Sequence, residues 1–138
     1  MRQSSDEVVT VVVADDDDEL RSTVAHALRD EGYVVSEAHD GAELIEMLDE
    51  GCVSPDVVLV DVKMPRLSGL GVLATLNRVH WDLPVVLMTA MRDRSVDTMA
   101  RRLGAVGVLH KPFDPDDLLT VVCNAQQVID ARRAGSLH

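Results

Sequence analysis

The sequence has few cysteines, no long apolar run and little that could form a disulfide framework. Its only cysteines are Cys52 and Cys123, which lack the C-x-x-C or Cys/His spacing of a metal site and so indicate free thiols in a reducing compartment. We expect both to be small buried side chains. No apolar run approaches the roughly 18 residues of a membrane span, and the polar residues 1–7 lack the apolar core of a signal peptide. We therefore expect a cytoplasmic protein with no membrane contact.

Aromatic and basic residues are also scarce. Aromatic residues make up 2% of a chain that is 46% apolar, so the core must consist of aliphatic side chains packed between helices and strands. The 13 Lys and Arg residues are outnumbered by 24 Asp and Glu residues, for a formal net charge of -11. Because nucleic-acid surfaces need clustered Lys and Arg, we expect no direct binding to nucleic acid. The length of 138 residues indicates one domain.

Strand and helix patterns alternate five times along the chain. Short, valine-rich apolar runs predict strands that are buried on both faces. These runs are Val8–Ala14, Tyr33–Ala38, Val57–Val60, Pro84–Met88 and Ala105–Leu109. The segments between and after them carry apolar residues at helical spacing. Strict alternation predicts a doubly wound α/β sandwich, in which a five-stranded parallel sheet has helices on both faces.

Cap residues support these helices. Asp40, Ser68 and Asp114-Pro115 occupy helix starts, where a side chain or a proline is favoured. Glycines at the predicted helix ends are Gly32, Gly51 and Gly104. We place one domain at residues 8–130, with a disordered N-terminal tail at 1–7 and a polar C-terminal tail at 131–138.

Polar residues follow four of the predicted strands. They are Asp15-Asp16, Asp61, Thr89 and Lys111. In a doubly wound sheet, ligands bind outside the carboxyl ends of the strands, so these side chains should meet at one edge. The adjacent Asp17, Asp18 and Glu19 fit a solvated helix N-terminus instead.

Massed carboxylates at this edge require a cation, and Mg2+ prefers such oxygen ligands. Asp61 could be only a turn residue or a helix cap. Together with the other groups, however, its carboxylate could attack phosphorus and form an acyl phosphate. Mg2+, the Lys111 ammonium and the Thr89 hydroxyl could then neutralise the phosphoryl oxygens. The five histidines are expected to be surface or structural residues.

The chain resembles the receiver domain of bacterial two-component response regulators, a (βα)5 flavodoxin-like fold, from about Val8 to Ile129. The matching motifs are Val13-Ala14-Asp15-Asp16-Asp17, Asp61-Val-Lys-Met-Pro-Arg-Leu-Ser-Gly69, Thr89-Ala90, Gly104-Ala105 and Lys111-Pro112-Phe113. The resemblance implies that Asp61 accepts a phosphoryl group from a phosphohistidine of a sensor histidine kinase or phosphotransfer protein. It also implies direct Mg2+ ligation by Asp16, Asp61 and the Lys63 carbonyl, and contact through water from Asp15. A cis peptide at Lys111-Pro112 is implied as well.

Two features depart from the family pattern. Val108 stands where receivers commonly have an aromatic residue that moves with the threonine, so either the switch is altered or Val108 simply packs. Lys63 and Met91 flank the site at positions that tune hydrolysis in the family, and neither obviously orients water. We therefore predict a fairly long-lived phosphoryl state.

Helix four carries a basic edge formed by Arg92, Arg94, Arg101 and Arg102. This edge is either a solvated face or part of a surface of helix four, strand five and helix five that binds a partner or a second copy. We do not expect an enzyme in the usual sense. An aspartate-nucleophile phosphatase would need a second aspartate where Lys63 stands, and a flavin module would need a Ser/Thr/Gly-rich loop after the first strand. An adaptor that works without phosphorylation remains an alternative.

Overall fold

The computed structural model describes residues 8–90 and 94–136 and contains one parallel sheet with the order β2-β1-β3-β4-β5. The strands are β1 (Thr10–Ala14), β2 (Val34–Ala38), β3 (Val57–Asp61), β4 (Val85–Thr89) and β5 (Gly107–His110). The helices are α1 (Asp18–Asp30), α2 (Gly41–Asp49), α3 (Gly69–Arg78), α4 (Arg94–Arg102) and α5 (Pro115–Ser136). The predicted doubly wound α/β fold is confirmed.

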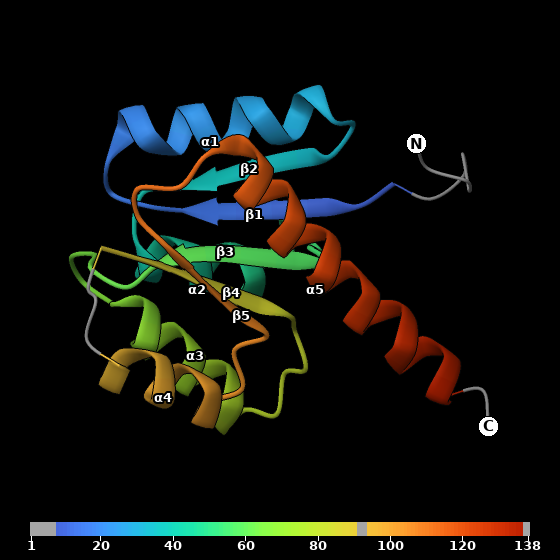
Figure 1. The fold of residues 1–138 in the computed structure, drawn as a ribbon. Coiled ribbons are helices and arrows are strands. Elements are labelled where there is room, and N and C mark those ends of the chain that lie inside the picture. The colour runs from blue at the N-terminus through green and yellow to red at the C-terminus, as the bar shows by residue number, and fades with distance from the viewer. Residues whose placement is uncertain (1–7, 91–93, 137–138) are drawn as a thin grey trace.

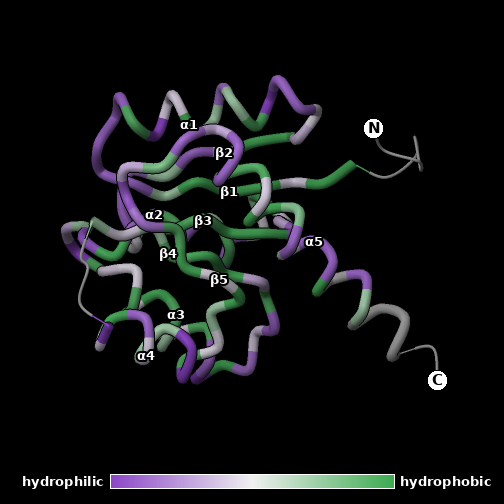
Figure 2. The backbone as a smooth tube through the Cα atoms, viewed as in Figure 1, coloured by the Kyte–Doolittle hydropathy of each residue, from purple (hydrophilic) through white to green (hydrophobic). Residues whose placement is uncertain are grey.

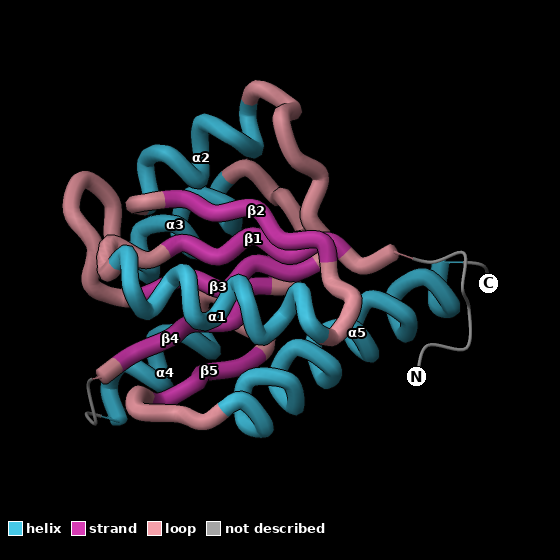
Figure 3. The backbone as a smooth tube through the Cα atoms, turned by 90° about the horizontal axis from the view of Figure 1, so that it is seen from above, coloured by secondary structure: helices cyan, strands magenta, loops and turns pink. Residues whose placement is uncertain are grey.

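The helices form two layers around the sheet. Helices α1 and α5 cover one face, and α2, α3 and α4 cover the other (Figures 1 and 3). Each layer has its own aliphatic cluster, because side chains alternate between the faces of a strand. Val11 and Val13 pack toward α1 and α5, whereas Val12 and Ala14 pack toward α2 and α3. The strands β1, β3 and β4 are accordingly apolar along most of their length (Figure 2), whereas β2 contains Ser36 and Glu37.

The cap predictions are confirmed. The side chains of Asp40 and Ser68 accept hydrogen bonds from Glu43 N and Gly71 N at the starts of α2 and α3, and Asp114 accepts from Asp117 N at the start of α5. The glycines at positions 32, 51 and 104 all have positive φ. Helix α5 extends to Ser136, past the predicted boundary at 130, and its last turns project beyond the sheet (Figure 1).

One prediction about the core is wrong. Cys52 and Cys123 are both exposed rather than buried. Cys52 lies in the turn after α2, and Cys123 lies on α5 between Val122 and the exposed Asn124. Their positions, in a turn and on the exposed side of a helix, outweigh the preference of cysteine for the interior. Within the described residues, no helix combines the length and apolar character needed to cross a membrane.

Candidate metal and phosphoacceptor site

The strand order places the predicted site residues next to one another. Strands β1 and β3 are neighbours at the centre of the sheet, where the chain turns in opposite directions and a crevice forms at the carboxyl edge. Ala14 pairs with Val60, so the residues that follow them, Asp15 and Asp61, lie side by side. Thr89 is the last residue of β4, and Lys111 directly follows β5.

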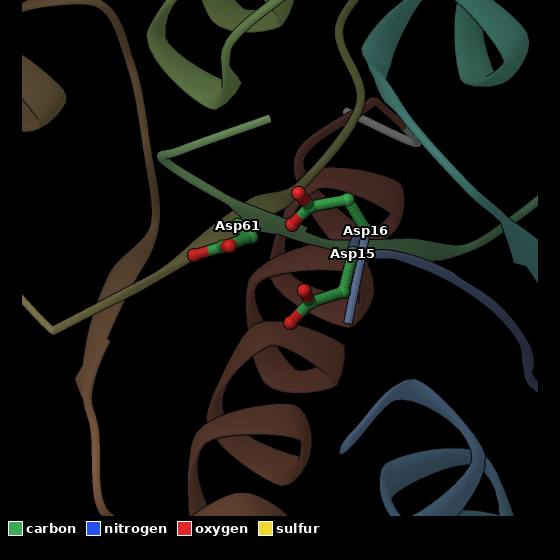
Figure 4. Close-up of side chains that lie close together, drawn as sticks. All are labelled: Asp15, Asp16 and Asp61. Carbon is green, nitrogen blue, oxygen red and sulfur yellow. The ribbon is translucent and has the colours of Figure 1, made fainter. Parts of the chain in front are cut away.

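Three carboxylates form a compact cluster at this edge. Oxygen atoms of Asp15, Asp16 and Asp61 all lie within 4.8 Å of one another, and Figure 4 shows the three side chains close together at the strand ends. Asp15 is fully buried and Asp61 is 6% exposed, whereas Asp16 is exposed. Carboxylates at this spacing repel unless a cation lies between or beside them. The donor set, which consists of oxygens only, fits a hard divalent ion such as Mg2+.

Lys111 supplies a positive charge beside two of the three carboxylates. Its Nζ lies 3.1 Å from Asp15 Oδ2 and 3.3 Å from Asp61 Oδ1. The backbone holds Lys111 in place, because its N–H donates to the Thr89 carbonyl at 2.8 Å. The Lys111-Pro112 peptide is cis, as predicted.

Burial and mutual repulsion change the protonation of the cluster. Burial, and then the negative charge of Asp15, raise the pKa of Asp61 from 3.8 to about 6, although Lys111 acts in the opposite direction. For Lys111 burial lowers the pKa, but the charges of Asp15 and Asp61 outweigh it and the pKa is raised. At neutral pH, Asp61 is therefore mostly ionised, although its charged form is less favoured than that of an exposed aspartate. Lys111 is a cation.

An open groove of about 700 Å³ borders the cluster. It is lined by Asp16, Val62, Lys63, Met64, Pro65, Ser68, Leu70 and Val96. The groove gives a ligand access to Asp16, the exposed member of the cluster, from the side of the β3–α3 loop. The Lys63 side chain is exposed at this entrance, whereas Met91, the other predicted flanking residue, lies outside the described residues.

Comparison with known proteins identifies this arrangement. A family model described as the response regulator receiver domain matches residues 11–123. The chain belongs to this family. Both the family and the fold predicted from the resemblance are therefore confirmed.

Individual relatives agree with this assignment. The receiver domain is 38% identical over 104 residues to the transcriptional regulatory protein PdtaR of Mycobacterium tuberculosis, covering 75% of this chain and 49% of PdtaR. It is 38% identical over 103 residues to the DNA-binding transcriptional regulator NtrC of Escherichia coli, covering 75% of this chain and 22% of NtrC. The chain thus spans about half or less of these relatives. A solved receiver domain protein from Clostridium thermocellum superposes with a TM-score of 0.83 at 28% identity, covering 90% of this chain and 98% of that one.

Two residues on β5 bear on how the receiver could switch. Val108 is half-buried and packs against the cluster beneath α2, α3 and α4. The His110 side chain reaches α4, where its Nε2 lies 3.2 Å from Asp97 Oδ2. Thr89 is 1% exposed and pairs with His110 in the sheet.

The sequence did not reveal the ion pairs of three polar residues near the site, although Asp40 was predicted as a helix cap. Arg21 and Asp40 are buried, at 7% and 8% exposure, and Arg66 forms a two-bond ion pair with Asp40. Arg21 shares the buried stripe of α1 with Val24 and Leu28, and a charged residue on an apolar stripe is a signal that it has a buried partner. Nothing in the sequence marked Arg66 in this way, because its positive φ and its contact with Asp40 arise only in the folded loop.

Proposed function

We propose that this receiver domain is a phosphoacceptor of a two-component system, phosphorylated on Asp61 by a phosphohistidine of a sensor histidine kinase or phosphotransfer protein. The supporting observation is the geometry around Asp61, in which a buried carboxylate lies 3.3 Å from Lys111 Nζ and within 4.8 Å of two further carboxylates. The Asp61 carboxylate, the Lys111 ammonium and the groove all lie at the carboxyl edge of the sheet.

The chemistry assigns a role to each residue. An Asp61 oxygen would attack phosphorus and form a P–O bond, while the P–N bond breaks and its electron pair returns to the imidazole. Lys111 would leave its ion pair with Asp61 to contact one phosphoryl oxygen. The Thr89 hydroxyl, at the end of the neighbouring β4, would donate to another. No general base is needed, because the attacking carboxylate is already ionised at neutral pH.

Mg2+ would bind to Asp16, Asp61 and the Lys63 backbone carbonyl, with Asp15 acting through water. When bound, such an ion neutralises charge on the transferred group and offsets the repulsion among the acids. The oxygen-only cluster supports this assignment. Asp15 suits an indirect role, because Lys111 Nζ and the Asp17 N–H already occupy its two carboxylate oxygens.

The experiment is intact-mass measurement after incubation with acetyl phosphate and Mg2+, on the wild type and on Asp61→Asn. We expect one phosphoryl adduct on the wild type, labile at alkaline pH, and none on the variant. Asp56→Asn is a matched control, because Asp56 precedes β3 and accepts from Thr10 N far from the groove; it should be phosphorylated normally. A wild type that gains no adduct from acetyl phosphate or from a phosphohistidine donor would favour an adaptor that works without phosphorylation.

We further propose that residues 8–130 form a single receiver domain, from which the last turns of α5 project, and that it acts in the cytoplasm as a signalling switch rather than as an enzyme with a separate substrate. Its output would lie in a partner or in another part of a longer regulator. Neither membrane nor nucleic acid would be contacted by this segment, whose net charge is -11.

The proposed output surface is formed by α4, β5 and α5. Arg101 and Arg102 are exposed at the end of α4, and Asp116 and Asp117 are exposed at the start of α5; Arg92 lies outside the described residues. Because opposite charges on one surface favour symmetric pairing, a second copy could bind here. Arg101→Glu should weaken phosphorylation-dependent dimerisation or partner binding, measured by analytical ultracentrifugation. Unchanged self-association and partner binding would exclude this surface.

With Lys63 at the entrance to the site, and Met91 expected beside it, no side chain is assigned to orient a hydrolytic water, and we propose a long-lived phosphoryl group. Loss of the adduct within seconds would contradict this. Val108 packs against the core, so any conformational change at β5 would involve repacking of an aliphatic side chain rather than burial of a large ring.

A further inference from the structure

Two loops, together with Asp61 at the end of β3, provide the proposed metal ligands, and both loops are linked to β2 or to the turn that follows it. The β1–α1 loop carries Asp15 and Asp16, and the β3–α3 loop carries Lys63. The edge strand β2 and the turn after it provide no ligand, yet Glu37 of β2 and Asp40 of the turn each bind an arginine from one of these loops or its helix.

The first connection runs through Arg21. All three of its guanidinium nitrogens are occupied: Nη1 donates to the Asp15 carbonyl at 2.7 Å, Nε to Glu37 Oε1 at 3.1 Å, and Nη2 lies 2.8 Å from Asp18 Oδ1. Arg21 is 7% exposed, and a charge buried to this degree is retained only when it is paired. The guanidinium therefore fixes the peptide that joins Asp15 to Asp16.

That peptide matters most for Asp16. Asp15 is held through its own side chain by Lys111 and the Asp17 N–H, and through its N–H by the Ala38 carbonyl. By contrast, within residues 8–90 and 94–136 the Asp16 side chain makes no hydrogen bond or ion pair. Its direction is set by the backbone on either side, which Arg21 holds against repulsion from Asp15 and Asp61.

The second connection runs through Arg66. Its Nε and Nη2 bind the two oxygens of Asp40 at 2.9 and 3.1 Å, a two-bond geometry that makes an ion pair more specific. Arg66 has a φ of 69°, a left-handed conformation that is costly for a side chain with a Cβ. The ion pair helps to hold this conformation three positions after Lys63. The same loop approaches α2 so closely that a Cβ at Gly41 would overlap the Leu67 carbonyl.

We infer that β2 and its following turn form an anchor for both metal-binding loops, and that Arg21 and Arg66 are positioning residues for Mg2+ through Glu37 and Asp40. This inference rests on the proposed function, because it assumes that the carboxylate cluster binds Mg2+. Outer partners of this kind set the orientation of metal ligands, and their loss weakens metal affinity.

The test is the Mg2+ dissociation constant from isothermal titration calorimetry at pH 7.5, at a temperature where every variant is folded. Arg21→Met should weaken binding about tenfold, and Asp40→Asn, which keeps a capping oxygen but loses the ion pair, about three- to fivefold. Arg29→Met is the matched control: Arg29 also binds Glu37 and the Val35 carbonyl of β2 but reaches neither loop, and its effect should be less than about twofold.

A purely structural role is separable from positioning, because it would lower the melting temperature without metal and leave the dissociation constant unchanged. If Arg21→Met does not fold, Glu37→Gln replaces it, since this change weakens the Arg21 pair and retains the bond to Asp15. Wild-type binding with unchanged affinity in the folded variants would overturn the anchor alone. A wild type that does not bind Mg2+ would overturn the proposed metal site and the anchor together.

Discussion

The two ends of the sheet differ in the chemistry of what they bury. Within the described residues, every buried polar or charged side chain belongs to the carboxyl end: these are Asp15, Arg21, Asp40, Asp61 and Thr89. At the amino ends of the same strands, the buried residues are valines such as Val11, Val57 and Val85. Stability and chemistry therefore occupy opposite ends of the sheet, because repulsion among the carboxylates at one end must be offset by well-packed apolar surface elsewhere.

The largest effect on stability should come from the apolar end. Leu28 is 0% exposed and lies in the apolar cluster between the sheet and helices α1 and α5. Leu28→Ala should lower the free energy of unfolding by about 3 kcal/mol, measured by urea denaturation, and the folded protein should still accept a phosphoryl group. Val8→Ala, at a position 59% exposed, is the control and should change stability by less than about 0.5 kcal/mol. A small effect of Leu28→Ala would mean that this core relaxes around the cavity.

At the polar end, a substitution should increase stability. The pKa of Asp61 is about 6 in the folded protein against an ordinary 3.8, so the native state binds more protons than the unfolded chain between these values. Unfolding free energy then falls as the pH rises through this window. Without metal at pH 7, Asp61→Asn should be more stable than the wild type by up to about 3 kcal/mol, and the difference should vanish below pH 4. Denaturant titrations in EDTA at several pH values measure this; a variant equal to the wild type at pH 7 would contradict it.

A smaller effect is expected from Mg2+, which would reduce the contrast between the two ends. At ten times its dissociation constant, Mg2+ should raise the unfolding free energy of the wild type by about 1.4 kcal/mol. Asp16→Ala should remove most of this increase, because it removes an exposed member of the cluster. Sodium chloride at matched ionic strength is the control. A melting temperature that responds equally to both salts would argue against a specific site.

Much of the fold was predictable because it rests on local patterns. The valine runs and helical spacings located all the strands and helices, and the caps at Asp40 and Ser68 have the predicted hydrogen bonds. Strand ends shifted by one or two residues, as at β1, which begins at Thr10 rather than Val8. The last helix continues to Ser136, past the predicted boundary at 130. Its final turns lie beyond the sheet, so they carry no apolar stripe from which they could have been predicted. Exposed Cys52 and Cys123 show that residue type alone does not decide burial.

The candidate site was predictable in its membership but not in its connections. Each acid, Thr89 and Lys111 follows an apolar run, and a parallel sheet brings such positions together. That Lys111 bridges Asp15 and Asp61, and that Asp61 has a raised pKa, depend on distances of a few ångströms and on burial. The ion pairs of Arg21 with Glu37 and of Arg66 with Asp40 were missed for the same reason, because the partners lie 16 and 26 residues apart in the sequence.

The order of strands and helices along the chain, the aliphatic core and the set of polar residues at the strand ends follow from periodicity, caps and composition, and all of these can be found in the sequence. Which charges meet, how deeply Asp15 and Asp61 are buried, and that Glu37 and Asp40 bind Arg21 and Arg66 depend on the folded chain. The difference is one of range, because hydrophobic periodicity involves neighbouring residues, whereas ion pairing and desolvation depend on where remote segments come to lie.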